Sequence, residues 1–165
     1  MCPSSDMATS IGRIILNLLS LEITLRLFLD EAQQPSGPTQ AMSLDLHNLA
    51  VGDWVPETPL TSYDTLGQLI KKANCELEKH GLPERVDDSV VALRDALAHG
   101  RVLGDRPEGP FRVFKFSKPC RGMVRVEVSV EITQDWLDQQ KKSTAAEAMK
   151  VVEAGRKLGL SCFPY

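Results

Sequence analysis

The sequence predicts a mainly α-helical fold in which four helices form a bundle and a small antiparallel β-hairpin is inserted before the last helix. Apolar residues recur at helical spacing in four long segments. The spacing changes to strict alternation in one place, between residues 124 and 132. The 165 residues correspond to about one domain, so we expect residues 1–165 to form a single domain.

The first helix is predicted over roughly residues 9–31, where Thr9 or Ser10 can cap its start. Leucines and isoleucines also lie off its main stripe, which is typical of a helix that is buried in a bundle or shared with a second subunit. Arg13, Glu22 and Arg26 interrupt this apolar surface. We expect these three residues to be buried ion-pair partners or to support a cleft.

The middle of the chain is predicted as a long connection followed by two helices. Residues 33–60 contain four prolines and indicate a loop with one short turn around 44–49. The second helix should span residues 62–80. Pro83 can begin the third helix, because its missing N–H is not needed in the first turn, and Gly100 should end it.

The hairpin and the last helix complete the predicted fold. Valines alternate with charged and polar residues over 124–132, which indicates a half-buried strand, and residues 111–116 are its expected partner. A turn at residues 118–122 would join the two strands. Thr133 should cap a helix that runs to about residue 158, and we expect Trp136, like Trp54, to lie in the core.

Composition excludes several classes of protein. With 42% hydrophobic and 25% charged residues, the chain is neither disordered nor fibrous. The four cysteines form no CxxC pair, which disfavours a zinc ribbon, a redox motif and a disulfide framework and favours a cytoplasmic protein. The three histidines are widely scattered, so we expect no metal and no cofactor. Charges interrupt every long apolar stretch, so we expect a soluble protein without a membrane partner.

Charge is unevenly distributed along the chain. The net charge is −3, but residues 101–126 contain seven Lys and Arg against two Asp and Glu. This segment either presents its cations to an anion or carries ordinary solvated charges. Aromatic residues make up only 5% of the chain, so base-stacking surfaces are expected to be scarce.

The end of the third predicted helix contains the pattern on which a function can be argued. Arg94 is followed after four residues by His99, with Asp95 directly after the arginine and Gly100 after the histidine. This pattern resembles the Arg-x(4–6)-His motif of the HEPN superfamily, the higher eukaryotes and prokaryotes nucleotide-binding domain. That family often has a polar residue at the position of Asp95.

The resemblance implies an α-helical bundle that forms a homodimer with the site at the subunit interface. Many members of the family are metal-independent endoribonucleases of toxin–antitoxin, phage-defence or RNA-processing systems. The implied partners are RNA and an antitoxin protein. In one toxin branch a tyrosine two positions after the histidine is modified by the antitoxin. Arg101 stands at that position here, so this mode of silencing is not expected.

The resemblance and the chemistry of the residues assign roles to five positions. His99 would act as the acid or base, and Arg94 would stabilise the charged phosphorane. Asp95, four residues before His99, would orient the imidazole and favour its protonated form. Arg101 and Arg112 would bind flanking phosphates of the RNA.

Helix geometry restricts how this site can form. Arg94 and His99 lie about 140° apart around a regular helix, so they cannot converge on one phosphate. Either the helix opens near Gly100, or two copies of the helix face each other across a two-fold axis.

Two other interpretations remain open. A non-catalytic module of the same type would use the cleft to hold RNA or a nucleotide, or only to dimerise. In a structural protein, Arg94 and His99 would merely interact with the last carbonyl groups of the helix and with its dipole.

Overall fold

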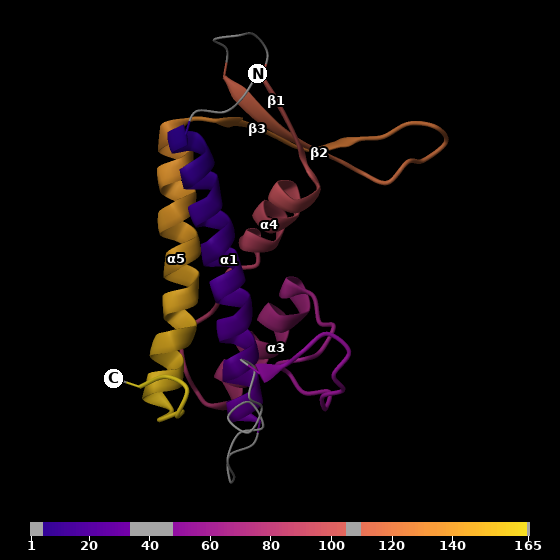
Figure 1. Ribbon diagram of the computed structural model, residues 1–165. Helices are drawn as coiled ribbons and strands as arrows, with labels where there is room; N and C mark the ends of the chain where they lie inside the picture. Colours follow the sequence, from indigo (N-terminus) through magenta and orange to yellow (C-terminus); the bar gives the residue numbers. More distant parts are fainter. Residues whose placement is uncertain (1–4, 34–47, 105–109, 165) are drawn as a thin grey trace. The chain divides into compact units, whose positions relative to one another are not determined.

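The structure, a computed structural model, describes residues 5–33, 48–104 and 110–164. In these ranges, helices contain most of the residues in regular structure, and a three-stranded antiparallel sheet accompanies them (Figure 1). Most of the turn predicted at 44–49 lies outside the described residues. The elements are α1 (Ser5–Ala32), α3 (Leu66–Lys79), α4 (Ser89–His99), β1 (Arg101–Gly104), β2 (Phe111–Phe116), β3 (Val126–Ile132) and α5 (Gln134–Lys157).

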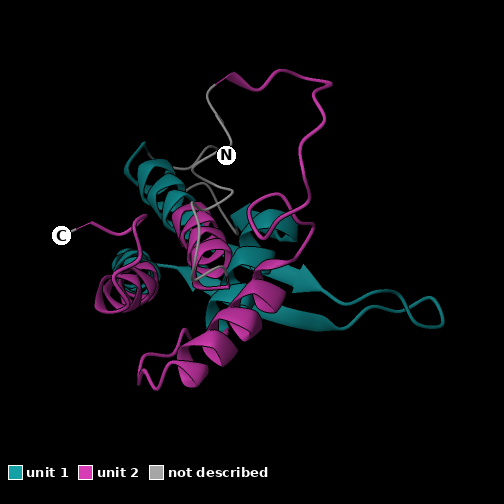
Figure 2. Cartoon of the chain, turned by 90° about the horizontal axis from the view of Figure 1, so that it is seen from below, with its two compact units in different colours: residues 1–18, 89–145 teal, residues 19–88, 146–165 magenta. Residues whose placement is uncertain are grey.

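The chain divides into two compact units (Figure 2). Unit 1 comprises residues 1–18 and 89–145 and contains α4 and the sheet. Unit 2 comprises residues 19–88 and 146–165 and contains α3. The helices α1 and α5 each contribute residues to both units.

Helix α1 begins at Ser5, four residues before its predicted start, so Thr9 is not its cap. The hydroxyl of Thr9 instead donates to the carbonyl oxygen of Ser5 at 2.8 Å, within the helix. Asp6 lies in the first turn, where the helix dipole favours a negative charge. Two large apolar side chains of this helix, Ile15 and Leu19, remain 40% and 57% exposed.

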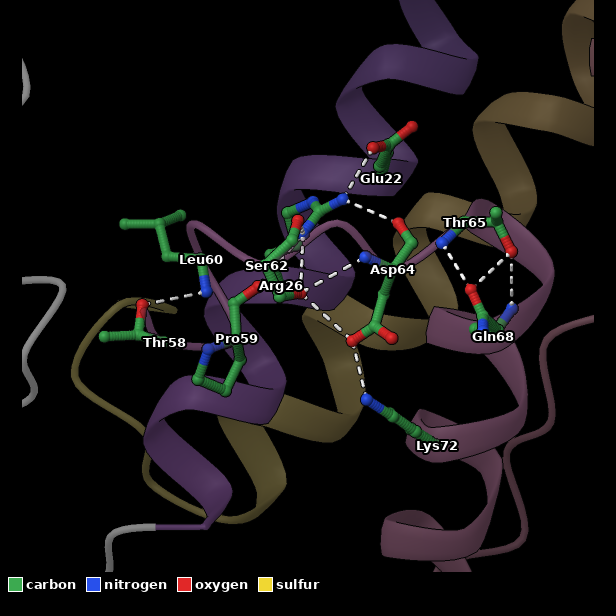
Figure 3. A network of polar contacts seen from close by, with 10 residues as sticks. All are labelled: Glu22, Arg26, Thr58, Pro59, Leu60, Ser62, Asp64, Thr65, Gln68 and Lys72. Carbon is green, nitrogen blue, oxygen red and sulfur yellow. Dashed lines mark hydrogen bonds and ion pairs between the residues drawn. The ribbon is translucent and has the colours of Figure 1, made fainter. Parts of the chain in front are cut away.

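Helix α3 begins at Leu66, later than the predicted residue 62, and Thr65 and Gln68 form a capping box there. The residues before it are held by Arg26 of α1 (Figure 3). The guanidinium of Arg26 donates to the carbonyl oxygens of Pro59, Ser62 and Asp64 at 3.1, 2.9 and 2.9 Å. It also pairs with the Glu22 carboxylate at 3.0 Å, which confirms these two residues as ion-pair partners.

Helix α4 begins at Ser89, so the prediction that it starts at Pro83 was wrong. The side chain of Asn74 binds both backbone groups of Val86 at 2.9 Å, and the Asp87 N–H donates to the Glu147 carboxylate at 3.0 Å. Backbone groups that bind these side chains do not take part in helical hydrogen bonds, which explains why residues 83–88 stay irregular.

The predicted single hairpin is part of a three-stranded sheet with the order β1-β2-β3. The additional strand, β1, pairs antiparallel with β2 from Arg101 opposite Phe114 to Gly104 opposite Phe111. The four residues of β1 are Arg-Val-Leu-Gly, which do not alternate between apolar and polar types, so no sequence pattern predicts this strand. All four residues are exposed. Gly100 joins it to α4, and a Cβ there would lie 2.0 Å from the Ala96 carbonyl oxygen.

The strand predicted over 124–132 is only partly buried. Strand β3 begins at Val126, and Val124 and Val126 are 53% and 52% exposed, whereas Ile132 at its end is 4% exposed. The hydroxyl of Thr133 accepts the Trp136 N–H at 3.1 Å, which confirms the predicted cap of α5. Trp54 is 99% exposed, so its predicted place in the core was wrong.

Candidate functional site

The three predicted catalytic residues lie on the C-terminal half of α4, in unit 1. The Arg94 guanidinium lies 3.3 Å from one carboxylate oxygen of Asp95, and the Lys115 ammonium lies 3.5 Å from the other. His99 is exposed in the last turn, and its side chain has no hydrogen bond or salt bridge within the described part of the chain. Asp95 therefore contacts two cations, and the expected contact with the imidazole is not formed.

Helix α4 stays regular to its end. The Gly100 N–H donates to the Ala96 carbonyl oxygen at 2.8 Å, as the next turn of an α-helix requires. Arg94 and His99 are then separated by about 140° around the axis. Of the two predicted routes to a common site, opening of the helix is not observed, so one copy of the chain does not bring these side chains together.

Lys115 is a site residue that the sequence pattern did not indicate. It lies two residues after Val113 on β2, and Val113 is 1% exposed and close to the junction of α4 with the sheet. Alternation along the strand therefore turns Lys115 toward α4, where its ammonium also lies 3.4 Å from Glu127. Two cations and two carboxylates balance in this cluster, which holds Arg94 and Lys115 in place but carries no net charge to attract an anion.

The two predicted phosphate-binding residues lie on the other face of the sheet. Arg101 is in register with Phe114 and therefore points to the same side, and its guanidinium lies 5.2 Å from the centre of the Phe116 ring. The rings of Phe114 and Phe116 stack at 6.4 Å with an angle of 15° between their planes. Arg112 lies two residues before Phe114 on β2, so alternation along the strand places it on the same side of the sheet. We call these four residues the aromatic–arginine face.

The aromatic–arginine face is open to solvent. The side chain of Arg112 is 46% exposed and lies 3.5 Å from the Glu131 carboxylate and 3.2 Å from the Ser129 hydroxyl. Arg101 is exposed, and the two phenylalanines are half-buried. Stacking rings together with arginines are the groups that proteins use to bind unpaired nucleobases and their phosphates. The low aromatic content of the chain predicted that base-stacking surfaces would be scarce, and it gave no indication that two of the rings lie side by side.

The opposite face of the sheet packs onto α4 and α5 around a small apolar pocket of about 200 Å³. Its volume lies below the roughly 300–1,000 Å³ of small-molecule sites, so we interpret it as a packing gap. The residues that line it are Ala92, Leu93, Ala96, Val113, Val128, Val130, Trp136 and Gln140.

The chain matches no known protein family, no curated protein and no solved structure. In the described ranges, no three His, Cys, Asp or Glu side chains are grouped so that they could hold a metal ion. None of the helices described is both long and apolar enough to cross a bilayer.

Proposed function

We propose that unit 1 binds single-stranded RNA on the aromatic–arginine face and that a pair of these units cleaves it without a metal ion. The observation that carries this proposal is the stacked pair Phe114 and Phe116 on the same side of the sheet as Arg101 and Arg112. Each ring offers a surface on which a base can stack, and the arginines provide charge for the adjacent phosphates.

The distribution of charge supports an anionic partner for unit 1. Its residues include eleven Lys and Arg against eight Asp and Glu, whereas unit 2 has eight against fourteen. Cations at residues 118, 121 and 125 continue the basic surface beyond the ends of β2 and β3. An RNA strand would therefore be attracted to unit 1, and its binding would weaken as salt is added.

The position of His99 supports a cleavage step. It precedes Arg101 by two residues, and Arg101 begins the edge strand β1. An RNA strand that crosses this edge would reach the imidazole. One His99 would remove the proton of a ribose 2′-OH, whose oxygen then attacks the phosphorus and displaces the 5′-oxygen. A second group, acting as the acid, would protonate that leaving oxygen. The products would be a 2′,3′-cyclic phosphate and a 5′-hydroxyl.

A second copy of the chain would supply the groups that one copy lacks. Two α4 helices facing each other would place Arg94 of one copy near His99 of the other, which their separation of about 140° forbids within one helix. Helix α1 offers apolar surface for such a pair, because four of its large side chains stay exposed. They are Ile15, Leu16, Leu19 and Ile23.

A second candidate function is RNA binding without cleavage. The observation that favours it is the Asp95 carboxylate, which contacts Arg94 and Lys115 rather than His99. Without an orienting partner, the imidazole of His99 would contribute little to proton transfer. The binding surface would be the same in both cases, so cleavage is the measurement that separates the two functions.

Cleavage is tested by incubating labelled RNA with the protein in EDTA. We expect cyclic phosphate ends with the wild-type chain and a decrease of at least about a hundredfold in rate for both H99A and R94A. Removal of an acid or base explains the loss in H99A, and removal of a cation that stabilises the transition-state charge explains the loss in R94A. H80A is the matched control, since His80 is also an exposed histidine at a helix end but lies in unit 2. Cleavage that persists in both site variants contradicts the catalytic proposal.

Binding is tested separately by titrating a short fluorescent RNA with the protein. Replacing Phe116 by Leu should weaken binding by about fivefold or more, because a stacked base is worth about 1–3 kcal/mol. R101Q and R112Q should each weaken binding and lower the dependence of log K on log salt by about 0.7 for every phosphate that is no longer neutralised. Equal affinity in all three variants would remove the aromatic–arginine face from the proposal.

A further inference from the structure

A polar cleft of about 450 Å³ lies in unit 1 between α1 and α5. It is separate from the residues of α4 and the sheet that form the candidate RNA site. Among the described residues, three cationic side chains and no carboxylate line it. Its polar lining residues are Thr9, Ser10, Arg13, Asn17, Lys141 and Lys142.

We propose that this cleft binds a compact multivalent anion of the pyrophosphate type. Arg13 was expected either to be a buried ion-pair partner or to support a cleft, and its side chain is exposed and lines this cleft. Arginine and lysine in one cleft are a common arrangement for phosphate groups, because the guanidinium supplies a planar fork of donors and the ammonium a compact charge.

Buried polar contacts hold the two walls of the cleft together. The Asn17 amide donates to the Lys141 carbonyl oxygen and to the Thr144 hydroxyl, both at 3.1 Å. Thr144 is fully buried, and its hydroxyl donates to the Gln140 carbonyl oxygen at 2.8 Å. These contacts fix the turn of α5 that carries Lys141 and Lys142 against α1, so the cations are positioned before any ligand arrives.

The charges of the cleft are only partly compensated. The Lys141 ammonium lies 2.8 Å from Asp138 and 3.5 Å from the Ser10 hydroxyl, and its hydrogen bond lowers the pKa of Asp138 below the usual 3.8. Arg13 and Lys142 make no salt bridge within the described residues. Lys142 also interacts electrostatically with Asp138. The cleft therefore has three cations to this one carboxylate, and its net positive charge raises the local concentration of anions.

The rest of the lining indicates which part of a ligand is recognised. Of the residues that the structure describes, Ala145 is the one apolar residue that lines the cleft. No aromatic side chain among them lines it, so these residues offer no surface on which a base could stack. The volume lies in the range of small-molecule sites. Linked phosphates, free or carried by a nucleoside diphosphate, match the charge and size. The inference does not depend on RNA binding at the sheet, because the two sites share no residue.

Isothermal titration of the whole chain with inorganic pyrophosphate at low salt tests the inference. We expect R13Q and K142Q each to weaken binding by about tenfold, as expected when one hydrogen bond to a charged group is removed. The matched controls are K71Q and K79Q, which remove exposed cations of unit 2 that belong neither to the cleft nor to the candidate RNA site. Their affinity should stay within about twofold of wild type, because an exposed charge outside the cleft acts on the anion only through screened solvent.

A titration with ADP distinguishes the sources of the anion. Affinity equal to that of pyrophosphate identifies a nucleoside-borne group as an accepted ligand, and binding of pyrophosphate alone identifies the free anion. The inference is overturned if the folded wild-type chain binds no pyrophosphate at millimolar concentration. It is also overturned if the control variants lose as much affinity as the cleft variants, since binding would then be a property of the overall charge.

Discussion

The two units use their cations in opposite ways. In unit 2, Arg26 is enclosed by carbonyl oxygens and by Glu22, and it ties the turn before α3 to α1 (Figure 3). In unit 1, Arg101 lies over an aromatic ring at the surface, and Arg13 lines an open cleft.

The apolar cores of the two units also differ, and the core of unit 2 is the larger one. Among the described residues, fifteen buried apolar side chains belong to unit 2 and seven to unit 1. A region that buries much apolar surface can enclose its charges, whereas a thin layer of helices and a small sheet leaves charges and rings exposed. The comparison indicates that unit 2 encloses its charges beside a larger apolar core, whereas unit 1 leaves cations and aromatic rings at its surface.

The strongest test of this difference replaces a cation in each unit. We expect R26M to lower the free energy of unfolding by about 2–4 kcal/mol, because it leaves three partly buried carbonyl groups and Glu22 without a partner. R112M should cost less than about 1 kcal/mol, since its ion pair is exposed. Urea unfolding measures both values. A similar decrease in the two variants would mean that the cations of the units are equivalent.

Cysteine reactivity should distinguish the interior of unit 2 from the surface of unit 1. Burial and the neighbouring Glu31 carboxylate raise the pKa of Cys162 to about 11. At pH 8 its thiolate fraction is then about a hundredfold below that of a thiol with the ordinary value of 9.0. Iodoacetamide should therefore modify the exposed Cys120 long before Cys162, as peptide mass spectrometry would show. In urea the difference should disappear, and its persistence there would contradict the burial argument.

Two glycines of unit 1 should respond to alanine with opposite signs. G100A should destabilise the chain by about 1–3 kcal/mol, because the new Cβ meets the Ala96 carbonyl oxygen and Val113. G12A should stabilise it by about 0.5–1 kcal/mol, since Gly12 lies inside α1 with nothing within 4 Å of a Cβ. Thermal unfolding followed by circular dichroism measures the two shifts. A stabilising G100A would show that α4 and β1 can separate freely.

The smallest expected effect is the dependence of the stability of unit 2 on acidic pH. Burial alone would raise the pKa of Glu31, but hydrogen bonds from Ser161 and Cys162 outweigh it and hold the pKa below the usual 4.5. Because the folded-state value is the lower one, this carboxylate stabilises unit 2 above about pH 4.5 and loses its contribution as pH falls through the folded-state pKa. The amide NMR signals of Ser161 and Cys162 should titrate with a midpoint below 4.5. A midpoint at or above that value would contradict the stabilisation of the Glu31 carboxylate by these hydrogen bonds.

Local patterns in the sequence predicted several elements closely. Residues 111–116 form β2 as expected, and Thr133 caps α5, because alternation and capping depend on neighbouring residues alone. The pairing of Arg26 with Glu22 follows from their spacing of four residues on one helix. The motif residues Arg94, Asp95 and His99 were placed correctly on one helix for the same reason.

Contacts between distant residues decided the rest. Asn74 and Glu147 keep residues 83–88 from joining α4, and no pattern within those residues indicates partners 12 and 60 positions away. The short strand β1 forms only because β2 pairs with it. Register and tertiary packing also put Asp95 beside Lys115, brought Phe114 and Phe116 together near Arg101, and opened a cleft at Arg13. The sequence by itself determined which side chains this protein has and on which elements most of them lie. Only the tertiary structure decided which of them meet, because charge pairing and stacking depend on distance in space rather than along the chain.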